Sequence, residues 1–138
     1  MMDEKEDYLQ AERERVAKLY TTKHKKGFPT KYSFVDWYSK QIQSQHYSCY
    51  YCETSIIDIK SLIKMDKLKT RKTRYGVRGP VLEINRKINC NGYSPDNCVL
   101  SCYYCNNDKS YITDGDDYQI NFGGNRKRYF CMLMKRLS

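Results

Sequence analysis

The sequence of 138 residues contains no apolar run long enough to cross a bilayer, and its beginning, MMDEKEDYLQAERER, lacks the apolar core of a signal peptide. It also lacks low-complexity linkers and internal repeats, apart from one pair of cysteine motifs, and its length suits one domain. A membrane protein and a secreted protein are therefore not expected. We expect an intracellular protein, in the cytoplasm or nucleus or associated with a virion if its source is viral, where thiols stay reduced.

The seven cysteines are an odd number, so complete disulfide pairing within one chain is excluded. Four of them form two Cys-x-x-Cys motifs, namely Cys49, Cys52, Cys102 and Cys105. Two such motifs at a domain-scale separation predict one tetrahedral structural Zn²⁺, which would stabilise a chain with a modest core. His46 is a less favoured ligand, because four cysteines complete the site. Cys90, Cys98 and Cys131 are predicted to be free thiols, with a local disulfide between Cys90 and Cys98 as the alternative under oxidation.

The formal net charge of +9 favours a polyanionic partner, because neutralising phosphates releases condensed counterions from nucleic acid. The most basic segment lies at 53–80, and its candidate DNA contacts are Lys64, Lys67, Lys69, Arg71, Lys72, Arg74 and Arg78. Tyr75 is the only aromatic residue among these cations, which favours phosphate contact over base stacking. A solvated insertion is the alternative. The apolar positions at 56–68 predict either a short helix or a pair of strands.

Two helices are predicted before the first cysteine motif. Apolar residues recur at helical spacing along residues 3–22, and they are Tyr8, Leu9, Val16, Leu19 and Tyr20. The segment KHKKG at 23–27 is expected to end this helix, with cations that serve either as helix C-terminal charges or as phosphate contacts. A second helix is predicted to start at Ser33, where Asp36 completes a weak capping box. Trp37 on this helix is expected to be a core residue.

Residues 81–110, VLEINRKINCNGYSPDNCVLSCYYCNNDKS, combine two predicted strands with a helix. Residues 81–84 alternate like a strand, and residues 99–101 provide the return strand after the polar loop GYSPDN. From Cys105 the pattern is helical to about residue 112.

The last part of the chain is predicted to hold an edge strand and a helix. Residues 118–122 read as the strand, and Gly123 and Gly124 are expected to interrupt it. Residues 125–137 have helix formers with apolar and basic sides. This helix is expected to dock on the core, to lie on DNA, or to form a homodimer together with the N-terminal helix.

The motifs taken together resemble a known family. Cys49-x-x-Cys52 is followed by LEINRKIN at 82–89, GYSPDN at 92–97 and CYYCNNDK at 102–109. In this order and spacing they resemble the HNH (His-Me finger) endonucleases with a four-cysteine structural zinc. The match is to the Asp-Arg branch, which includes PacI-like restriction enzymes and phage HNH proteins. The resemblance implies a ββα-metal finger, in which two strands and a helix hold a divalent cation against a scissile phosphate.

The resemblance also assigns roles to individual residues. Asn97 corresponds to the middle asparagine of the family, which braces the loop and orients the base, and Asn106 corresponds to the final metal ligand. Asn85 stands where the family has its metal-binding aspartate, and Arg86 where it has the general-base histidine. Tyr51 lies between the first two zinc cysteines, at the position of the base proposed for the Asp-Arg branch.

Several of these positions depart from what hydrolysis needs. Asn85 and Asn106 offer neutral amides where Mg²⁺ or Mn²⁺ prefers carboxylates, and Arg86 stays protonated. Tyr51 is a base near neutral pH only if a cation such as Arg86 lowers its pKa. Glu83 shares a strand face with Asn85 and is the candidate replacement ligand, unless it pairs with a nearby cation.

The predicted fold class is therefore α+β, with a zinc-stapled ββα-metal finger at 46–112 that includes the basic insertion at 53–80. An N-terminal helical extension at 1–45 and a C-terminal strand and helix extension at 113–138 flank it.

The predicted function is that of a degenerate, inactive HNH-like protein that binds duplex DNA, with Lys109 as a further phosphate contact. One alternative is an active metal-dependent endonuclease that uses Glu83, Asn106 and Tyr51. The other is a zinc-dependent protein–protein adaptor, whose charge would serve only solubility.

Overall fold

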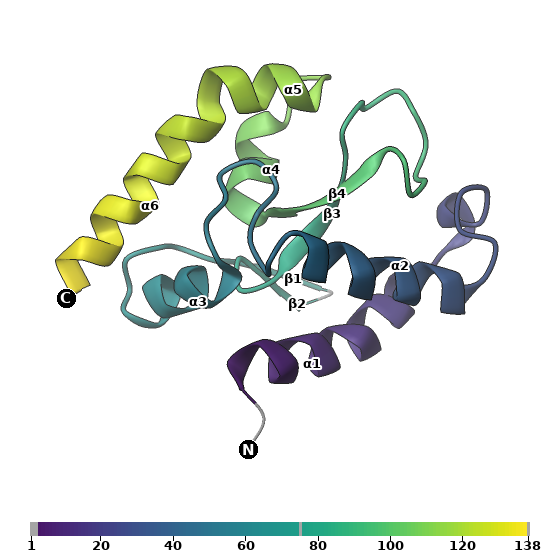
Figure 1. Cartoon of the computed structure of the whole chain (residues 1–138), viewed down its shortest axis with the longest axis horizontal. Coiled ribbons are helices and arrows are strands. Elements are labelled where there is room, and N and C mark those ends of the chain that lie inside the picture. The colour runs from purple at the N-terminus through teal and green to yellow at the C-terminus, as the bar shows by residue number, and fades with distance from the viewer. Residues whose placement is uncertain (1–2, 75, 138) are drawn as a thin grey trace.

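The computed structural model describes residues 3–74 and 76–137, and its centre is a ββα unit (Figure 1). Strand β3 (Leu82–Arg86) pairs antiparallel with β4 (Cys98–Cys102), and α4 (Tyr103–Lys109) follows directly. All five residues of β4 are buried, so this strand forms the middle of the core. The α+β class and the ββα arrangement are confirmed. Helix α4 ends at Lys109, earlier than the predicted residue 112.

Two helices cover one side of this unit and pack on each other (Figure 1). Helix α1 (Glu4–Leu19) ends three residues before the predicted 22, and a short 3-10 helix, η1 (Thr22–His24), follows. Helix α2 (Lys31–Ser44) starts before Ser33, because Thr30 is the N-cap and exchanges hydrogen bonds with Ser33. Trp37 packs against Phe28 and Phe34, as expected of a core residue.

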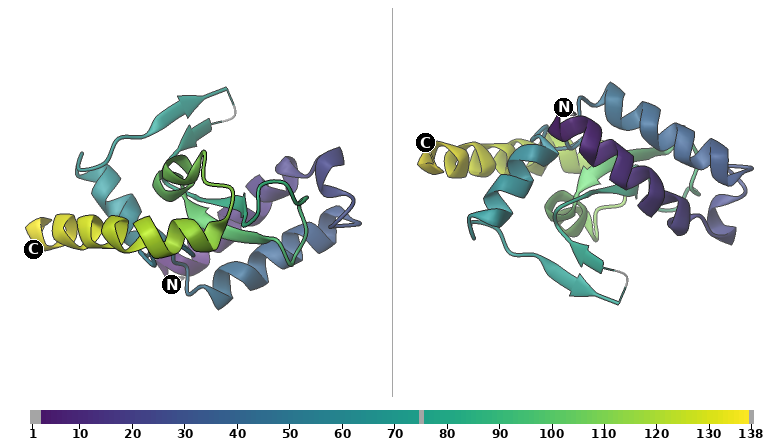
Figure 2. Two further views of the ribbon diagram at one scale, coloured as in Figure 1. Left: turned by 90° about the horizontal axis from the view of Figure 1, so that it is seen from above. Right: turned by 90° about the horizontal axis from the view of Figure 1, so that it is seen from below.

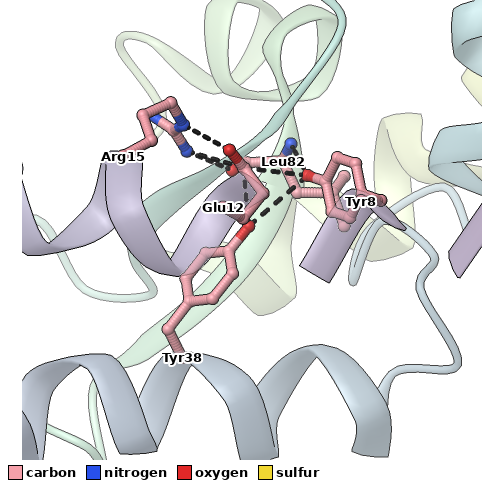
Figure 3. A network of polar contacts seen from close by, with 5 residues as sticks. All are labelled: Tyr8, Glu12, Arg15, Tyr38 and Leu82. Carbon is pink, nitrogen blue, oxygen red and sulfur yellow. Dashed lines mark hydrogen bonds and ion pairs between the residues drawn. The ribbon is translucent and has the colours of Figure 1, made fainter. Parts of the chain in front are cut away.

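A buried carboxylate joins α1 to both α2 and β3 (Figure 3). Glu12 accepts hydrogen bonds from the hydroxyl groups of Tyr8 (3.1 Å) and Tyr38 (2.8 Å) and from the Arg15 guanidinium (2.8 Å). The Tyr8 oxygen in turn accepts from the backbone N–H of Leu82 at 2.9 Å. Burial raises the pKa of both tyrosines well above the usual value, so they remain neutral donors. The start of β3 is therefore fixed by α1.

Of the two alternatives for the apolar positions at 56–68, the short helix is formed, and a pair of strands that was not predicted follows at 71–78. Helix α3 (Ile56–Lys64) buries Ile56, Ile59 and Leu62. It is followed by a hairpin of β1 (Arg71–Thr73) and β2 (Gly76–Arg78), which projects from the body of the protein (Figure 2).

The predicted edge strand at 118–122 is wrong. The segment is helical from α5 (Gly115–Tyr118) through a π-helical stretch, η2 (Gln119–Gly123), into α6 (Gly124–Leu137), which packs on α3. Asp114 starts this helix, because its carboxylate accepts from the N–H groups of residues 116 and 117. The alternation of apolar residues at 118, 120 and 122 had suggested a strand. No helix within the described ranges is long and apolar enough to span a membrane.

The two adjacent glycines do not break the helix, and they differ in their surroundings. A Cβ on Gly123 would lie 2.7 Å from the carbonyl oxygen of Tyr51, whereas a Cβ on Gly124 would meet no atom within 4 Å. Gly123 thus lets the helix approach the first cysteine motif.

We predict opposite effects of alanine at these two positions. Gly123→Ala should lower the free energy of unfolding by about 1–3 kcal/mol, because the new methyl group collides with backbone. Gly124→Ala should raise it by up to about 1 kcal/mol, because alanine loses less entropy in a helix. Chemical denaturation of the two variants measures the difference, and equal effects would contradict the close approach.

The buried carboxylate gives a second prediction. Glu12→Ala leaves Arg15, Tyr8 and Tyr38 without their acceptor, and it should lower the free energy of unfolding by about 3–5 kcal/mol. Glu14→Ala, two positions along on the exposed side of α1, is the matched control and should change it by less than about 0.5 kcal/mol. A small effect at Glu12 in urea denaturation would mean that α1 is not anchored through this network.

Candidate functional site

The two cysteine motifs meet in one buried cluster. The ligand atoms of Cys49, Cys52, Cys102 and Cys105 all lie within 4.8 Å of one another. The Sγ atoms of Cys52 and Cys102 are 4.0 Å apart, far beyond the roughly 2.05 Å of a disulfide and close to the roughly 3.8 Å between sulfurs around tetrahedral zinc. Cys102 also caps α4, because its Sγ accepts from the Cys105 N–H at 3.3 Å. The four thiols therefore fit a structural Zn²⁺.

The other cysteines and His46 lie outside this cluster. His46 is exposed and is not among the grouped ligands. Cys98 is buried on β4, while Cys90 and Cys131 are exposed, and all three are free thiols. The alternative disulfide between Cys90 and Cys98 is not formed.

Five residues singled out in the sequence form one chain of hydrogen bonds beside the cysteine cluster. The Tyr51 hydroxyl donates to Asn85 Oδ1 (2.9 Å), and Asn85 Nδ2 donates to Asn106 Oδ1 (2.6 Å). Asn106 Nδ2 donates to Glu83 Oε1 (2.8 Å). The guanidinium of Arg78 then donates to both oxygens of Glu83, at 2.8 and 2.6 Å. The fold has thus brought the proposed base, the proposed ligands and one insertion cation together.

These candidate metal ligands do not fit a catalytic Mg²⁺ or Mn²⁺. Both candidate amide oxygens, on Asn85 and Asn106, already accept hydrogen bonds from side chains. The Glu83 carboxylate is neutralised by two bonds from Arg78, the ion pair that the sequence left as the alternative. Hard divalent cations favour several carboxylate or water oxygens, and here each candidate oxygen is already engaged.

Neither Tyr51 nor Arg86 is placed to take a proton from water. The Tyr51 side chain is buried, and burial raises the pKa of its hydroxyl well above the usual value. Arg86 does not offset this, because its guanidinium lies over the ring of Tyr93, 5.0 Å from the ring centre. The condition for Tyr51 to act as a base, a pKa lowered by a cation such as Arg86, is therefore not met in this geometry.

Asn97 braces the loop between β3 and β4. Its side-chain nitrogen donates to the carbonyls of Ile88 (3.1 Å) and Gly92 (3.1 Å), and its side-chain oxygen accepts from the Ile88 N–H (3.1 Å). Its backbone carbonyl accepts from the Lys87 N–H at 2.7 Å. These bonds fix the path of the loop that carries Tyr93.

Two predicted DNA contacts have other roles. Lys109 is only 2% exposed, and its ammonium donates to the Arg86 carbonyl (3.2 Å) and to Asn89 Oδ1 (2.7 Å). Burial lowers its pKa. Arg78 binds Glu83 and lies over the Tyr103 ring at 4.7 Å. The other predicted DNA contacts in the insertion are exposed, and they are Lys64, Lys67, Lys69, Arg71, Lys72 and Arg74.

A cleft of about 300 Å³ opens beside this chain of hydrogen bonds. Arg78, Arg86 and Lys109 line it, and no acidic residue does so among the described residues. Its other lining residues are Ile84, Asn85, Asn89, Tyr93, Asn106, Asn107 and Ser110. Cationic groups beside neutral amide donors suit an anion such as a phosphate group. Tyr93 and Asn89 were not predicted, although the GYSPDN loop pointed to this region.

The cysteine cluster gives a prediction about metal content. The purified protein should contain about one Zn²⁺ per chain, and Cys105→Ser should lose the metal and cooperative unfolding together. Cys131→Ser removes an exposed thiol and should keep both. Elemental analysis and thermal unfolding with and without EDTA measure this, and a zinc-free protein that unfolds cooperatively would contradict the assignment.

Comparison with known proteins places this geometry in context. The chain resembles a solved structure of the rare-cutting HNH restriction endonuclease PacI, with 29% sequence identity and a TM-score of 0.55. The match covers 72% of this chain, which spans 63% of that chain. No protein-family model and no curated protein matches the sequence. The ββα unit with its four-cysteine cluster is thus an HNH-like fold.

Proposed function

We propose that this protein is a degenerate HNH-like module of the Asp-Arg branch, which binds duplex DNA and does not cleave it. The observation that carries the proposal is the series of side-chain hydrogen bonds that runs from Tyr51 through Asn85, Asn106 and Glu83 to Arg78. It satisfies every group that would otherwise bind a divalent metal or activate water. The likeness to PacI supports DNA as the partner.

The cleft would bind one phosphate of the DNA backbone. Arg86 supplies a permanent charge at the cleft, and the Tyr93 ring and the loop braced by Asn97 position it. A guanidinium donates two parallel hydrogen bonds to phosphate oxygens, so this contact needs no metal ion. Lys109 contributes mainly by ordering the Arg86 backbone.

The projecting hairpin would supply further contacts to the backbone or groove of the duplex. A two-stranded ribbon is narrow enough for the major groove, and an isolated hairpin with this charge gains stability from a polyanion. Its base is anchored to the finger, because the Tyr104 hydroxyl donates to the Lys69 carbonyl (2.7 Å) and Arg78 pairs with Glu83. The contacts proposed here are exposed cations of the hairpin and of the segment that leads into it from the end of α3, namely Lys64, Lys67, Lys69, Arg71, Lys72 and Arg74.

Binding without cleavage is the expected result for the full zinc-loaded chain. Supercoiled plasmid should not be nicked with Mg²⁺, Mn²⁺ or EDTA. Affinity for a mixed-sequence duplex should fall by about 10³-fold between 50 and 200 mM salt if roughly six phosphates are contacted. Metal-dependent nicking that Glu83→Ala abolishes would support the active-nuclease alternative. Negligible or salt-insensitive binding would support the adaptor.

The role of Arg86 has its own test. Arg86→Gln should reduce the slope of log K against log salt by about one, because one phosphate contact is lost. Arg128→Gln, on α6 and outside the cleft, removes the same charge and should leave the slope unchanged. Equal slopes for wild type and the Arg86 variant in fluorescence-anisotropy titrations would exclude the cleft as a phosphate site. The homodimer stays a prediction, which analytical ultracentrifugation can test.

A further inference from the structure

A second, larger cavity of about 710 Å³ adjoins the cleft, between the N-terminal helix and the finger. The two cavities share Arg78, Ile84, Tyr93 and Asn106 in their walls, so they lie side by side, and together they are called the groove here. The residues that α1, η1 and their connection contribute to the larger cavity are Arg15, Lys18, Leu19, Thr21, Lys23 and His24. The N-terminal extension therefore forms a wall of the candidate site.

The groove is lined by many more cationic than anionic side chains. Among the described residues that line the two cavities, six are cationic side chains, and Glu83 is the one carboxylate. Glu83 is paired with Arg78, and Arg15 is paired with the buried Glu12. Lys18 and Lys23 are both exposed, so their charges are available along the wall.

Tyr93 connects the cleft to this wall. Both the Arg86 guanidinium and the Lys23 ammonium lie 5.0 Å from the centre of its ring. The His24 ring packs edge-on against it, with ring centres 4.8 Å apart. Gly27, after η1, packs directly against the backbone of Tyr93, because a Cβ there would lie only 2.0 Å from the Tyr93 carbonyl oxygen. The cation of the cleft and a cation of the extension are thus held on one aromatic side chain.

The position of Lys23 also argues against a role as a helix charge. Helix α1 ends at Leu19, and the basic residue of its last turn is Lys18. Lys23 follows in the three-residue η1, which carries little dipole. The Glu12 network ties α1, the part of the wall that carries Lys18, to Leu82, the residue before Glu83 (Figure 3).

We infer that α1 and η1 form a second phosphate-binding wall, in which Lys18 and Lys23 contact the backbone of the same DNA duplex that enters the cleft. This inference rests on the proposed function and extends it to the N-terminal extension. An extended polyanion suits cations spread over two adjacent cavities better than a small ligand does, because its charges are distributed along its length. The wall adds phosphate contacts, which position the duplex without reading its sequence.

The test is a pair of double variants of the full zinc-loaded chain. Lys18→Gln/Lys23→Gln should make the slope of log K against log salt less steep by about two, for a mixed-sequence duplex of about 30 base pairs. Lys5→Gln/Lys31→Gln removes the same net charge from exposed positions that line neither cavity, and its slope should equal that of the wild type. Zinc content and circular dichroism verify that both variants are folded.

The possible failures are distinguishable. If the wild type binds with a steep salt dependence but the two double variants behave alike, the wall is not a DNA contact and the proposed function stands. If the wild type itself shows no salt-dependent binding, the proposed function fails and this inference fails with it.

Discussion

The convergence of four cysteine thiols at one point determines where the residues of the candidate site lie. Cys49 and Cys52 bring the turn before α3 to the junction of β4 and α4, where Cys102 and Cys105 complete the cluster. Tyr51 lies between two of these ligands, and Asn106 directly follows a third. One end of the hydrogen-bond chain, Tyr51, and its middle member, Asn106, are therefore positioned by the cysteine cluster. Because metal binding is coupled to folding in such small domains, the shape of the cleft depends on the same free energy that stabilises the fold.

The hydrogen bonds beside this cluster are the basis for choosing between a cleft that binds a divalent metal ion and one that binds a phosphate. A buried amide without partners costs about 1–3 kcal/mol, and in this site Asn85 and Asn106 satisfy each other and their neighbours. A divalent cation would have to displace these bonds and separate Glu83 from Arg78. The proposal of a cleft that binds a phosphate through fixed cations rests on these bonds. In that proposal the ββα unit keeps the HNH-like fold while its candidate oxygen ligands bond to neighbouring side chains.

The distribution of charge matters more than its total. Several cations on α2 and α6, outside the groove, are paired with carboxylates, and these pairs are Lys40 with Asp36, Lys127 with Glu53, and Arg126 with Asp108. The groove between α1 and the finger has six cationic side chains among its described lining residues, and two of them, Arg15 and Arg78, pair with Glu12 and Glu83. The proposed binding of a polyanion rests on this local excess of positive charge, whereas net charge alone serves solubility equally well.

The spacing of the two Cys-x-x-Cys motifs and the local periodicity predicted the cysteine cluster and the two strands with their helix, whereas the HNH-like fold was implied by the resemblance of the motifs to that family. The sequence did not determine the helix at 115–123, where an alternating pattern suggested a strand and the Asp114 cap decided otherwise. Only the tertiary structure showed that Lys109 is buried and that Arg78 neutralises Glu83. The partners of a charged side chain come from distant segments of the chain. The sequence therefore does not reveal whether a given lysine or arginine contacts solvent, a carboxylate or a phosphate.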